Sequence, residues 1–187
     1  MNLSSIIAEA DLLVPNEVPT ADKVMWLNAL NQDFFNVVKI PRVISLTPVV
    51  DKDTYTLSTE VRLKNIDLLT VGLIKYKELL PTAPNPLQNT YTFDDSTNTL
   101  TLRPAPYNSG LQGVLRYSRI ATTNFTASNL SAVPEAPDEY HFSFVSGLAS
   151  FLADAMDNKT KAANYEAQYR AIWNRAGEQY QRGSVSG

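Results

Sequence analysis

Residues 90–103 read TYTFDDSTNTLTLR, and this stretch has the pattern of an antiparallel β-hairpin. Aromatic and aliphatic residues alternate with threonines on both sides of the polar segment 94–98. A period of two puts one kind of side chain on each face of a strand. The stretch therefore predicts an antiparallel sheet with one apolar face packed on a core and one hydroxyl-bearing face outside.

The same period extends outward over residues 42–120, a block dense in β-branched residues and threonines. Asp51-Lys52-Asp53 is expected to form a hairpin turn between the first two strands of the block, and Gly72 to mark a bulge or bend inside a long buried strand. Loops are expected at residues 81–86 and 104–113. The expected strands, besides the hairpin, are residues 43–50, 54–61, 66–76 and 114–120.

On both sides of this block apolar residues recur every three or four positions, which indicates helices. Thr20 is expected as the N-cap of the second helix, and Pro137 as the first residue of the third. The expected helices are residues 3–13, 20–38, 137–155 and 158–181. The predicted fold is α+β: residues 1–41 and 121–187 form a helical bundle domain, and residues 42–120 form an inserted antiparallel β sandwich or barrel.

Composition narrows the classes of function. The 187 residues carry a formal net charge of −3, a single histidine and no cysteine. We therefore expect no cofactor, no cysteine-based metal site and no multi-histidine metal site. The 16 basic and 19 acidic side chains leave no basic excess for tight binding of nucleic acid. Apolar runs fall short of the ~20 residues of a membrane span, and acidic residues interrupt the first of them, so neither a membrane partner nor a secretory signal is expected.

Two pairs of neighbouring carboxylates have both a catalytic and a structural interpretation. Asp94 and Asp95 are adjacent, and Asp51 and Asp53 flank a lysine. A hydrolase needs two carboxylates that face one bond across a cleft, roughly 5–10 Å apart. Asp is also favoured in turns because its side chain bonds the nearby backbone. We interpret both pairs as turn residues.

Asp138, Glu139 and His141 form an acid–histidine cluster at helical spacing. Such a cluster could hold a metal or a proton relay. The structural interpretation, which we favour, has the acids stabilising a helix start and the histidine partly buried. Gly110 and Gly113 are not followed by the lysine–serine pair of a phosphate-binding loop, so nucleotide binding is not expected.

The last predicted helix is both basic and aromatic, and residues 183–187 after it are expected to be a flexible tail. One interpretation is an amphipathic helix with a solvated basic face. The other is a docking arm, because Tyr, Trp and Arg are enriched in binding hot spots. Both interpretations can be correct, each for different turns of the same helix. The candidate docking residues are Tyr169, Ile172, Trp173, Arg175, Tyr180 and Arg182.

Several stretches resemble the head-to-tail adaptor proteins of tailed bacteriophages. A helix beginning TADKVMWLN (residues 20–28) precedes YTLSTEV (residues 55–61), which is similar to the family's Tyr-x-Leu-Pro-x-Asp strand, with Ser58 in place of the proline. PEAPDEYH (residues 134–141), followed by an alanine-rich helix, and NYEAQY (residues 164–169) resemble the two C-terminal helices of the family.

This resemblance implies a structural protein without catalysis, located at the head–tail junction of the virion and in the host cytoplasm during assembly. It implies a homo-oligomeric ring, a dodecamer, beneath the portal protein. Such a ring extends the DNA channel without binding the passing genome specifically, and it offers a docking platform for a tail or nozzle protein. In relatives the C-terminal segment reaches the portal, so the candidate docking residues would bind the portal protein.

Two other classes of function stay open at the level of sequence. A virion-associated cell-wall hydrolase would need a carboxylate pair in a cleft, for which Glu135, Asp138 and Glu139 are the clustered candidates. A small-ligand or carbohydrate-binding β module on a helical base would need an open concave face on its sheet. A concave face closed by side chains would exclude this second alternative.

Overall fold

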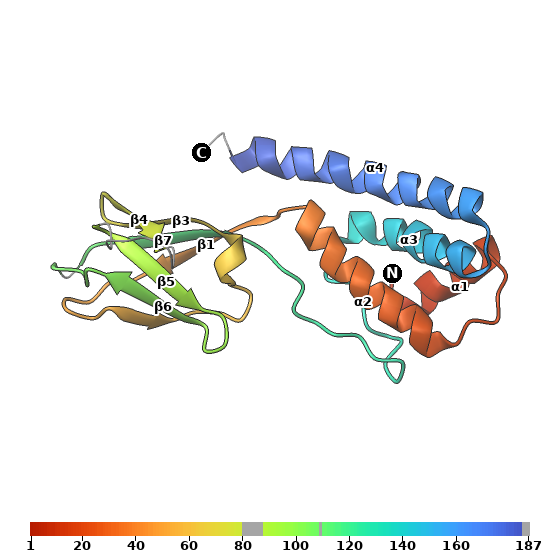
Figure 1. The fold of residues 1–187 in the computed structure, drawn as a ribbon, viewed down its shortest axis with the longest axis horizontal. Coiled ribbons are helices and arrows are strands. Elements are labelled where there is room, and N and C mark those ends of the chain that lie inside the picture. The colour runs from red at the N-terminus through yellow and green to blue at the C-terminus, as the bar shows by residue number, and fades with distance from the viewer. Residues whose placement is uncertain (80–87, 109, 185–187) are drawn as a thin grey trace. The chain divides into compact units, whose positions relative to one another are not determined.

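The computed structural model describes residues 1–79, 88–108 and 110–184, with side chains up to residue 181 in the last helix. The chain divides into two compact units. The helical unit comprises Met1–Lys39 and the chain from Ala121 onward, and the β unit comprises Ile40–Ile120 (Figure 1). Helices from both chain ends and a sheet between them confirm the predicted α+β class. The expected tail at 183–187 is wrong for residues 183 and 184, which belong to the last helix, and residues 185–187 lie outside the described residues.

The helical unit contains α1 (Leu3–Leu13), α2 (Thr20–Val37), α3 (His141–Ala155) and α4 (Lys159–Ser184). Asn2 caps α1, because its side chain accepts a hydrogen bond from the Ser5 backbone nitrogen at 2.9 Å. The prediction that Thr20 caps α2 is wrong. Thr20 is the first helical residue, and the Pro19 carbonyl before it accepts hydrogen bonds from the nitrogens of the first turn.

The start of α3 also differs from the expectation. Pro137 precedes a 3-10 helix, η2 (Asp138–Tyr140), and α3 follows at His141. Tight 3-10 turns are frequent at helix ends because they bond backbone groups that the α-helix leaves unpaired.

Aromatic side chains fill the core of the helical unit. Phe34, Phe144 and Trp173 come from α2, α3 and α4, and each is fully buried. The Phe34 ring meets the Trp173 ring edge-on with centroids 5.5 Å apart, and it lies 6.0 Å from the Phe144 ring. Burial of each such side chain stabilises a fold by about 1.5–3 kcal/mol. One aromatic cluster therefore ties three helices together.

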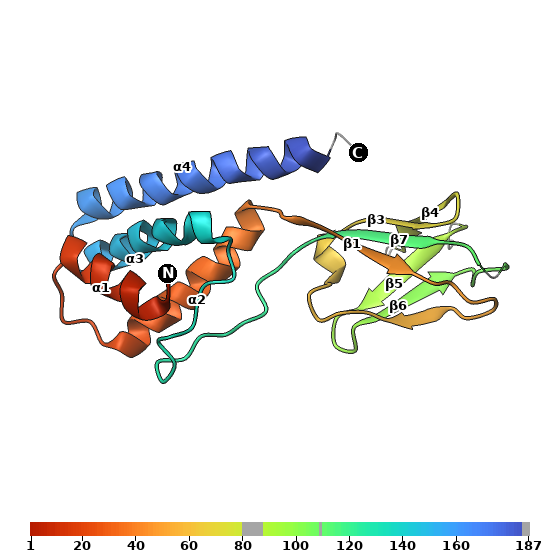
Figure 2. The ribbon, with the colours of Figure 1, turned by 180° about the vertical axis from the view of Figure 1, so that it is seen from behind.

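The β unit contains β1 (Pro41–Leu46), β2 (Thr54–Thr56), a 3-10 helix η1 (Leu63–Asn65), β3 (Ile66–Val71), β4 (Ile74–Glu78), β5 (Thr90–Asp94), β6 (Thr99–Arg103) and β7 (Gly113–Ser118). In the described part of the chain the sheet has the order β1-β7-β3-β4-β5-β6-β2. The sheet is curled (Figures 1 and 2), and buried side chains of β3 to β7 share one core inside the curl.

The sheet confirms the hairpin at residues 90–103, with Phe93 opposite Leu100 and Thr90 opposite Arg103. It is not antiparallel throughout, because β4 and β5 run parallel. Because the pair is parallel, β5 begins at the end of the sheet where β4 also begins.

The expected hairpin between residues 43–50 and 54–61 is wrong. β1 pairs with β7 and β2 pairs with β6, so the two strands lie at opposite edges of the sheet. Pro48 has no N–H for a ladder and follows the end of β1. Hydrogen bonds to distant segments hold the connection instead: the Asp51 nitrogen donates to the Pro106 carbonyl at 3.0 Å, and the Leu102 nitrogen donates to the Asp53 carbonyl at 2.8 Å.

The expected long strand over residues 66–76 is also wrong, because it is a hairpin of β3 and β4. Val71 pairs with Ile74, so Gly72 and Leu73 form a two-residue turn. Gly72 has φ +59°, a conformation that glycine adopts without steric cost and that tight hairpin turns require.

Candidate functional site

The turn carboxylates bond the backbone and side chains of their own unit. Asp94 accepts hydrogen bonds from the Ser96 nitrogen at 2.8 Å, the Ser96 hydroxyl at 2.6 Å and the Thr97 hydroxyl at 2.9 Å. These bonds, those from Ser96 first, lower the pKa of Asp94. Asp95 accepts from the Leu63 nitrogen at 2.8 Å, so each carboxylate fixes a turn.

The acid–histidine cluster is also held by structural contacts. His141 is buried, its Nε2 donates to the Ala136 carbonyl at 2.7 Å, and its Nδ1 lies 2.8 Å from the Met1 nitrogen. The Asp138 side chain is exposed, 3.6 Å from Nδ1. Glu135 accepts from the Thr122 and Thr123 nitrogens at 2.8 and 2.6 Å, and thereby ties the segment after the β unit to the segment before α3.

The described residues contain no group of three or more His, Cys, Asp or Glu side chains that could hold a metal ion. The interior of the curled sheet is filled by buried side chains, among them Leu69, Leu100 and Leu115. A β module that binds a small ligand on an open concave face therefore does not fit the described part of the sheet. Among the same residues, no helix is both long and apolar enough to cross a membrane.

The candidate docking residues of α4 fall into two groups. Tyr169 and Trp173 are buried in the helical unit: their rings lie 4.6 Å apart, and Trp173 Nε1 donates to the Ser143 hydroxyl at 2.7 Å. Burial raises the pKa of Tyr169. Ile172 and Arg175 are exposed. Of these four residues only Ile172 and Arg175 are open to solvent, whereas the buried pair positions the helix.

The remaining two candidates lie near the end of α4. Tyr180 is half-buried, and the Arg182 side chain lies outside the described residues. α4 passes close to the end of α2 at Gly177, where a Cβ atom would lie 3.3 Å from the Val37 carbonyl oxygen. Within the helical unit the last turns of α4 extend past the ends of α2 and α3 (Figures 1 and 2). These turns form a projecting arm.

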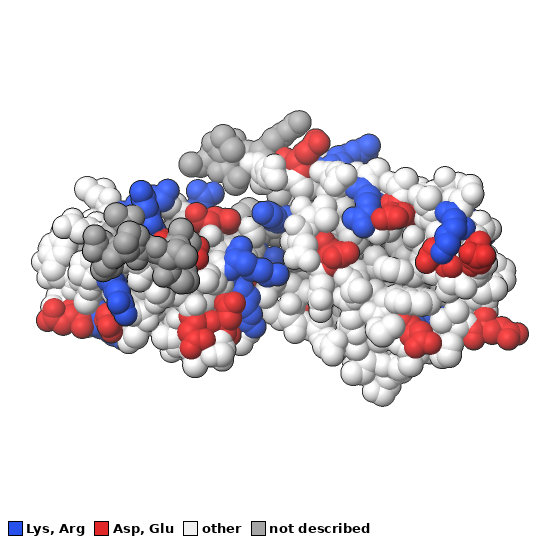
Figure 3. Space-filling view, in the orientation of Figure 1, with Lys and Arg blue, Asp and Glu red and all other residues white. Residues whose placement is uncertain are grey.

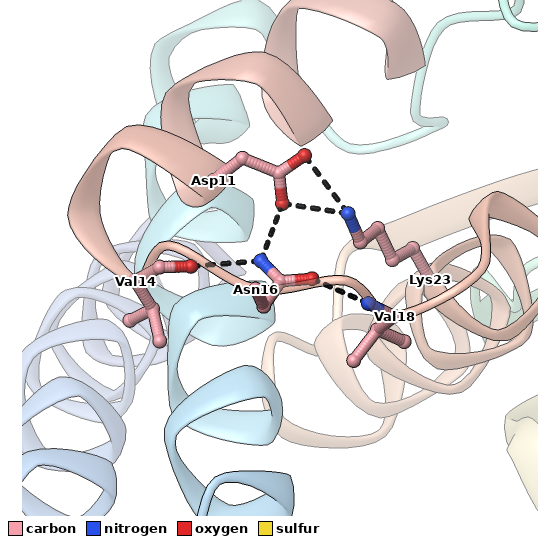
Figure 4. A network of polar contacts seen from close by, with 5 residues as sticks. All are labelled: Asp11, Val14, Asn16, Val18 and Lys23. Atoms are coloured by element: carbon pink, nitrogen blue, oxygen red, sulfur yellow. Dashed lines mark hydrogen bonds and ion pairs between the residues drawn. The ribbon is translucent and has the colours of Figure 1, made fainter.

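A second surface of the helical unit is an open hollow of about 710 Å³, the α1–α2 hollow, lined by Pro15, Asn16, Glu17, Val18 and Met156. A polar network holds its wall (Figure 4). The Asn16 amide donates to Asp11 Oδ1 at 2.8 Å and to the Val14 carbonyl at 2.7 Å, and it accepts from the Val18 nitrogen at 3.0 Å.

An ion pair completes this network. The buried Lys23 ammonium donates to both Asp11 oxygens at 2.7 and 2.8 Å. Loss of Asp11 would leave the buried Lys23 ammonium without a compensating charge. The ion pair therefore favours one arrangement of the segment that connects α1 to α2. The hollow is preformed.

The β unit presents a third surface at the end of the sheet where Leu46 pairs with Gly113. This distal tip lies opposite the sheet end at which the chain enters and leaves, where Pro41 pairs with Ser118. Its loops brace one another, for example through the Gly72 nitrogen, which donates to the Gln112 carbonyl at 2.8 Å. The tip carries exposed apolar side chains of Val49, Val50, Leu73 and Tyr107.

Charge divides unequally between the two units. Residues 40–120 carry nine basic and seven acidic side chains, and the rest of the chain carries seven basic and 12 acidic ones. The β unit therefore has a net charge of +2 and the helical unit −5. Figure 3 shows one face of this distribution, with Lys and Arg atoms gathered over the β unit.

Both units of the chain fall within the match to one protein family. The family model described as SU10 adaptor protein matches residues 1–186. The chain belongs to the SU10 adaptor protein family. This membership confirms the resemblance to phage head-to-tail adaptor proteins, and it covers both units and α4. No curated protein matches the chain.

Sequence patterns did not indicate two of the three surfaces of this adaptor. The α1–α2 hollow depends on Met156, which is far in sequence from the Pro15–Val18 wall. The tip depends on loops that meet only in the folded sheet. Gly72 followed by Leu73, between apolar residues that can pair, was the available signal for the hairpin turn at the tip.

Proposed function

We propose that this adaptor forms a ring beneath the phage portal, extends the DNA channel and provides the docking platform for a tail or nozzle protein. The observation that carries the proposal is the family match over residues 1–186. The role is structural and involves no catalysis. The adaptor acts at the head–tail junction of the virion after assembly in the host cytoplasm, and the ring is a dodecamer.

The portal protein is the proposed partner of the projecting arm. Ile172 and Arg175 lie exposed on α4, and the arm continues past the other helices. Exposed apolar and Arg side chains on a rigid helix suit a helix-in-groove contact. The half-buried Tyr180 lies further along α4, and buried Tyr169 and Trp173 hold the helix in place. Arg182, predicted from the sequence as a docking residue, stays part of the proposed portal contact.

The charge supports a channel through which DNA passes without specific binding. A net charge of −3 gives no overall attraction for phosphates. The basic excess lies on the β unit, and a net charge of +2 there is too small to follow a duplex backbone. In the proposed ring the genome therefore meets no tight binding surface.

Mixing the purified adaptor with a portal protein tests the proposal. Electron microscopy of the mixture should show a ring added to one end of the portal. Portals that stay bare at all salt and protein concentrations would refute it. Cell-wall clearing by the purified protein that is lost in Glu139→Gln would instead support the hydrolase alternative.

A further inference from the structure

We infer that the distal tip of one copy docks into the α1–α2 hollow of a second copy of this chain, with Leu73 as the inserted side chain. The inference rests on the ring proposed above, and it names a contact between neighbouring subunits. It arises from two surfaces of the same chain that complement each other in apolar character and charge.

The tip supplies the inserted group. Leu73 is fully exposed, at 105% of the reference area, in the turn between β3 and β4. The turn is braced, because Gly72 bonds Gln112 and packs near Leu111. A large apolar side chain that a rigid turn holds in water gains free energy when a partner covers it, and little ordering entropy is lost.

The hollow supplies the receptor. Pro15, Val18 and Met156 give it apolar walls, and Leu12 and Leu13 at the end of α1 are exposed close by in the chain. Its volume of about 710 Å³ suits an apolar side chain together with its flanking residues. Because the Asn16 network fixes the wall, the hollow needs no rearrangement before it binds.

The charges beside the two surfaces have opposite signs. Lys75 and Lys77 lie two and four residues beyond Leu73, both are exposed, and neither makes an ion pair within the part of the chain that the structure describes. Glu17 lines the hollow, and the exposed Asp157 follows Met156. The net charges of +2 on the β unit and −5 on the helical unit reinforce the match.

The occupant is a second copy because the two complementary surfaces belong to one chain. A protruding apolar group and a hollow at different places on a molecule make a heterologous contact, in which each copy binds the next. Such contacts repeat, and they close into a ring where the rotation between copies allows it. An isologous dimer would instead place two identical patches together.

Disulfide trapping tests this contact without background, because the chain has no cysteine. A tagged Leu73→Cys variant is mixed with an untagged Met156→Cys variant, with and without a portal, and oxidised. We expect mixed dimers to form roughly tenfold faster than in a control mixture of Leu73→Cys with Met25→Cys, because only docked thiols come within disulfide reach. Met25 is 59% exposed on α2 and Met156 is 55% exposed, so the two partners are matched in accessibility.

A charge exchange gives an independent readout by sedimentation velocity. Lys75→Glu and Glu17→Lys should each weaken self-association roughly threefold, the size expected for exposed ion pairs. Mixing the two variants should restore association, because each then meets an opposite charge on its neighbour. The inference would be overturned if self-association were restored only in a chain that carries both changes and not in the mixture of the two variants. That result would show that the two residues meet within one chain.

The outcomes separate this inference from the proposed function. Mixed dimers without portal binding would support the contact and refute the portal role. Portal binding with mixed dimers no faster than the control, at every protein concentration, would refute the contact and leave the portal role standing. Predominance of dimers between two Leu73→Cys chains would show an isologous contact and would also refute it.

Discussion

At the scale of the residue, Trp173 was predicted to lie on a docking face, but it packs in the core of the helical unit. Its ring meets Phe34, Phe144 and Tyr169, and its Nε1 donates to the Ser143 hydroxyl. Aromatic spacing on a basic helix is compatible with both a core and an interface. Whether such residues lie in the core or at an interface depends on the helices that pack against them. Here those helices are α2 and α3, and α2 is distant from α4 in the sequence.

Trp173→Ala should lower the free energy of unfolding by about 3–5 kcal/mol, because it leaves a cavity among three helices. Trp173→Phe should cost about 1–3 kcal/mol, since most of the ring contact remains and the hydrogen bond to Ser143 is lost. Urea denaturation followed by circular dichroism measures both values. Trp26→Ala is the control: Trp26 is half-buried against Phe151, so the loss should be smaller.

Asp94 gives a prediction on pH. Its pKa is lowered in the folded protein, so its contribution to stability is present above the unfolded pKa of about 3.9 and is lost as pH falls through the lower folded value. Asp94→Asn should therefore lower the melting temperature at pH 7, and the difference from the natural chain should shrink towards pH 2. A difference that stays constant across this range would contradict the assigned hydrogen bonds.

At the scale of the element, sequence patterns placed the helices and the 90–103 hairpin well because their periodicity is local. They failed where strand pairing is non-local. The 51–53 segment has good turn chemistry, yet β1 and β2 bind distant partners. Gly72 fits both a bulge in one strand and a turn between two, and only the pairing of Val71 with Ile74 distinguishes them.

The β3–β4 turn can be tested at Gly72. Gly72→Ala should lower the free energy of unfolding by about 1–2 kcal/mol, because other residues adopt positive φ at that cost. Gly72→Asn should cost less, since Asn tolerates the left-handed region. Equal losses for Ala and Asn in urea denaturation would point to the contact with Leu111 as the cause instead of φ.

The exposed face of α4 can be tested by truncation to alanine. Ile172→Ala and Arg175→Ala should each weaken binding to the portal about fivefold or more, as expected for hot-spot residues. Gln168→Ala is a matched control, because Gln168 is also exposed on α4. Alanine favours helix at all three positions, so circular dichroism should be unchanged. Equal binding by all three variants in a pull-down titration would remove the portal role from this face.

At the scale of the whole molecule, the adaptor combines two units of opposite net charge with three candidate contact surfaces: the arm of α4, the α1–α2 hollow and the distal tip. Composition could indicate a scaffold, because the chain lacks cysteine and has a single histidine. It could not show where the charge lies. The order of elements predicted the division into helices and sheet, whereas the hollow and the tip arise from contacts between distant segments.

The central claim is that this adaptor assembles on a portal as a ring. Electron microscopy of portal and adaptor mixed at stoichiometric excess of adaptor tests it most directly. The proposal predicts one ring of adaptor density, coaxial with the portal, at one end of each portal particle. Portal particles without added density, or single adaptor copies bound without a closed ring, would contradict it.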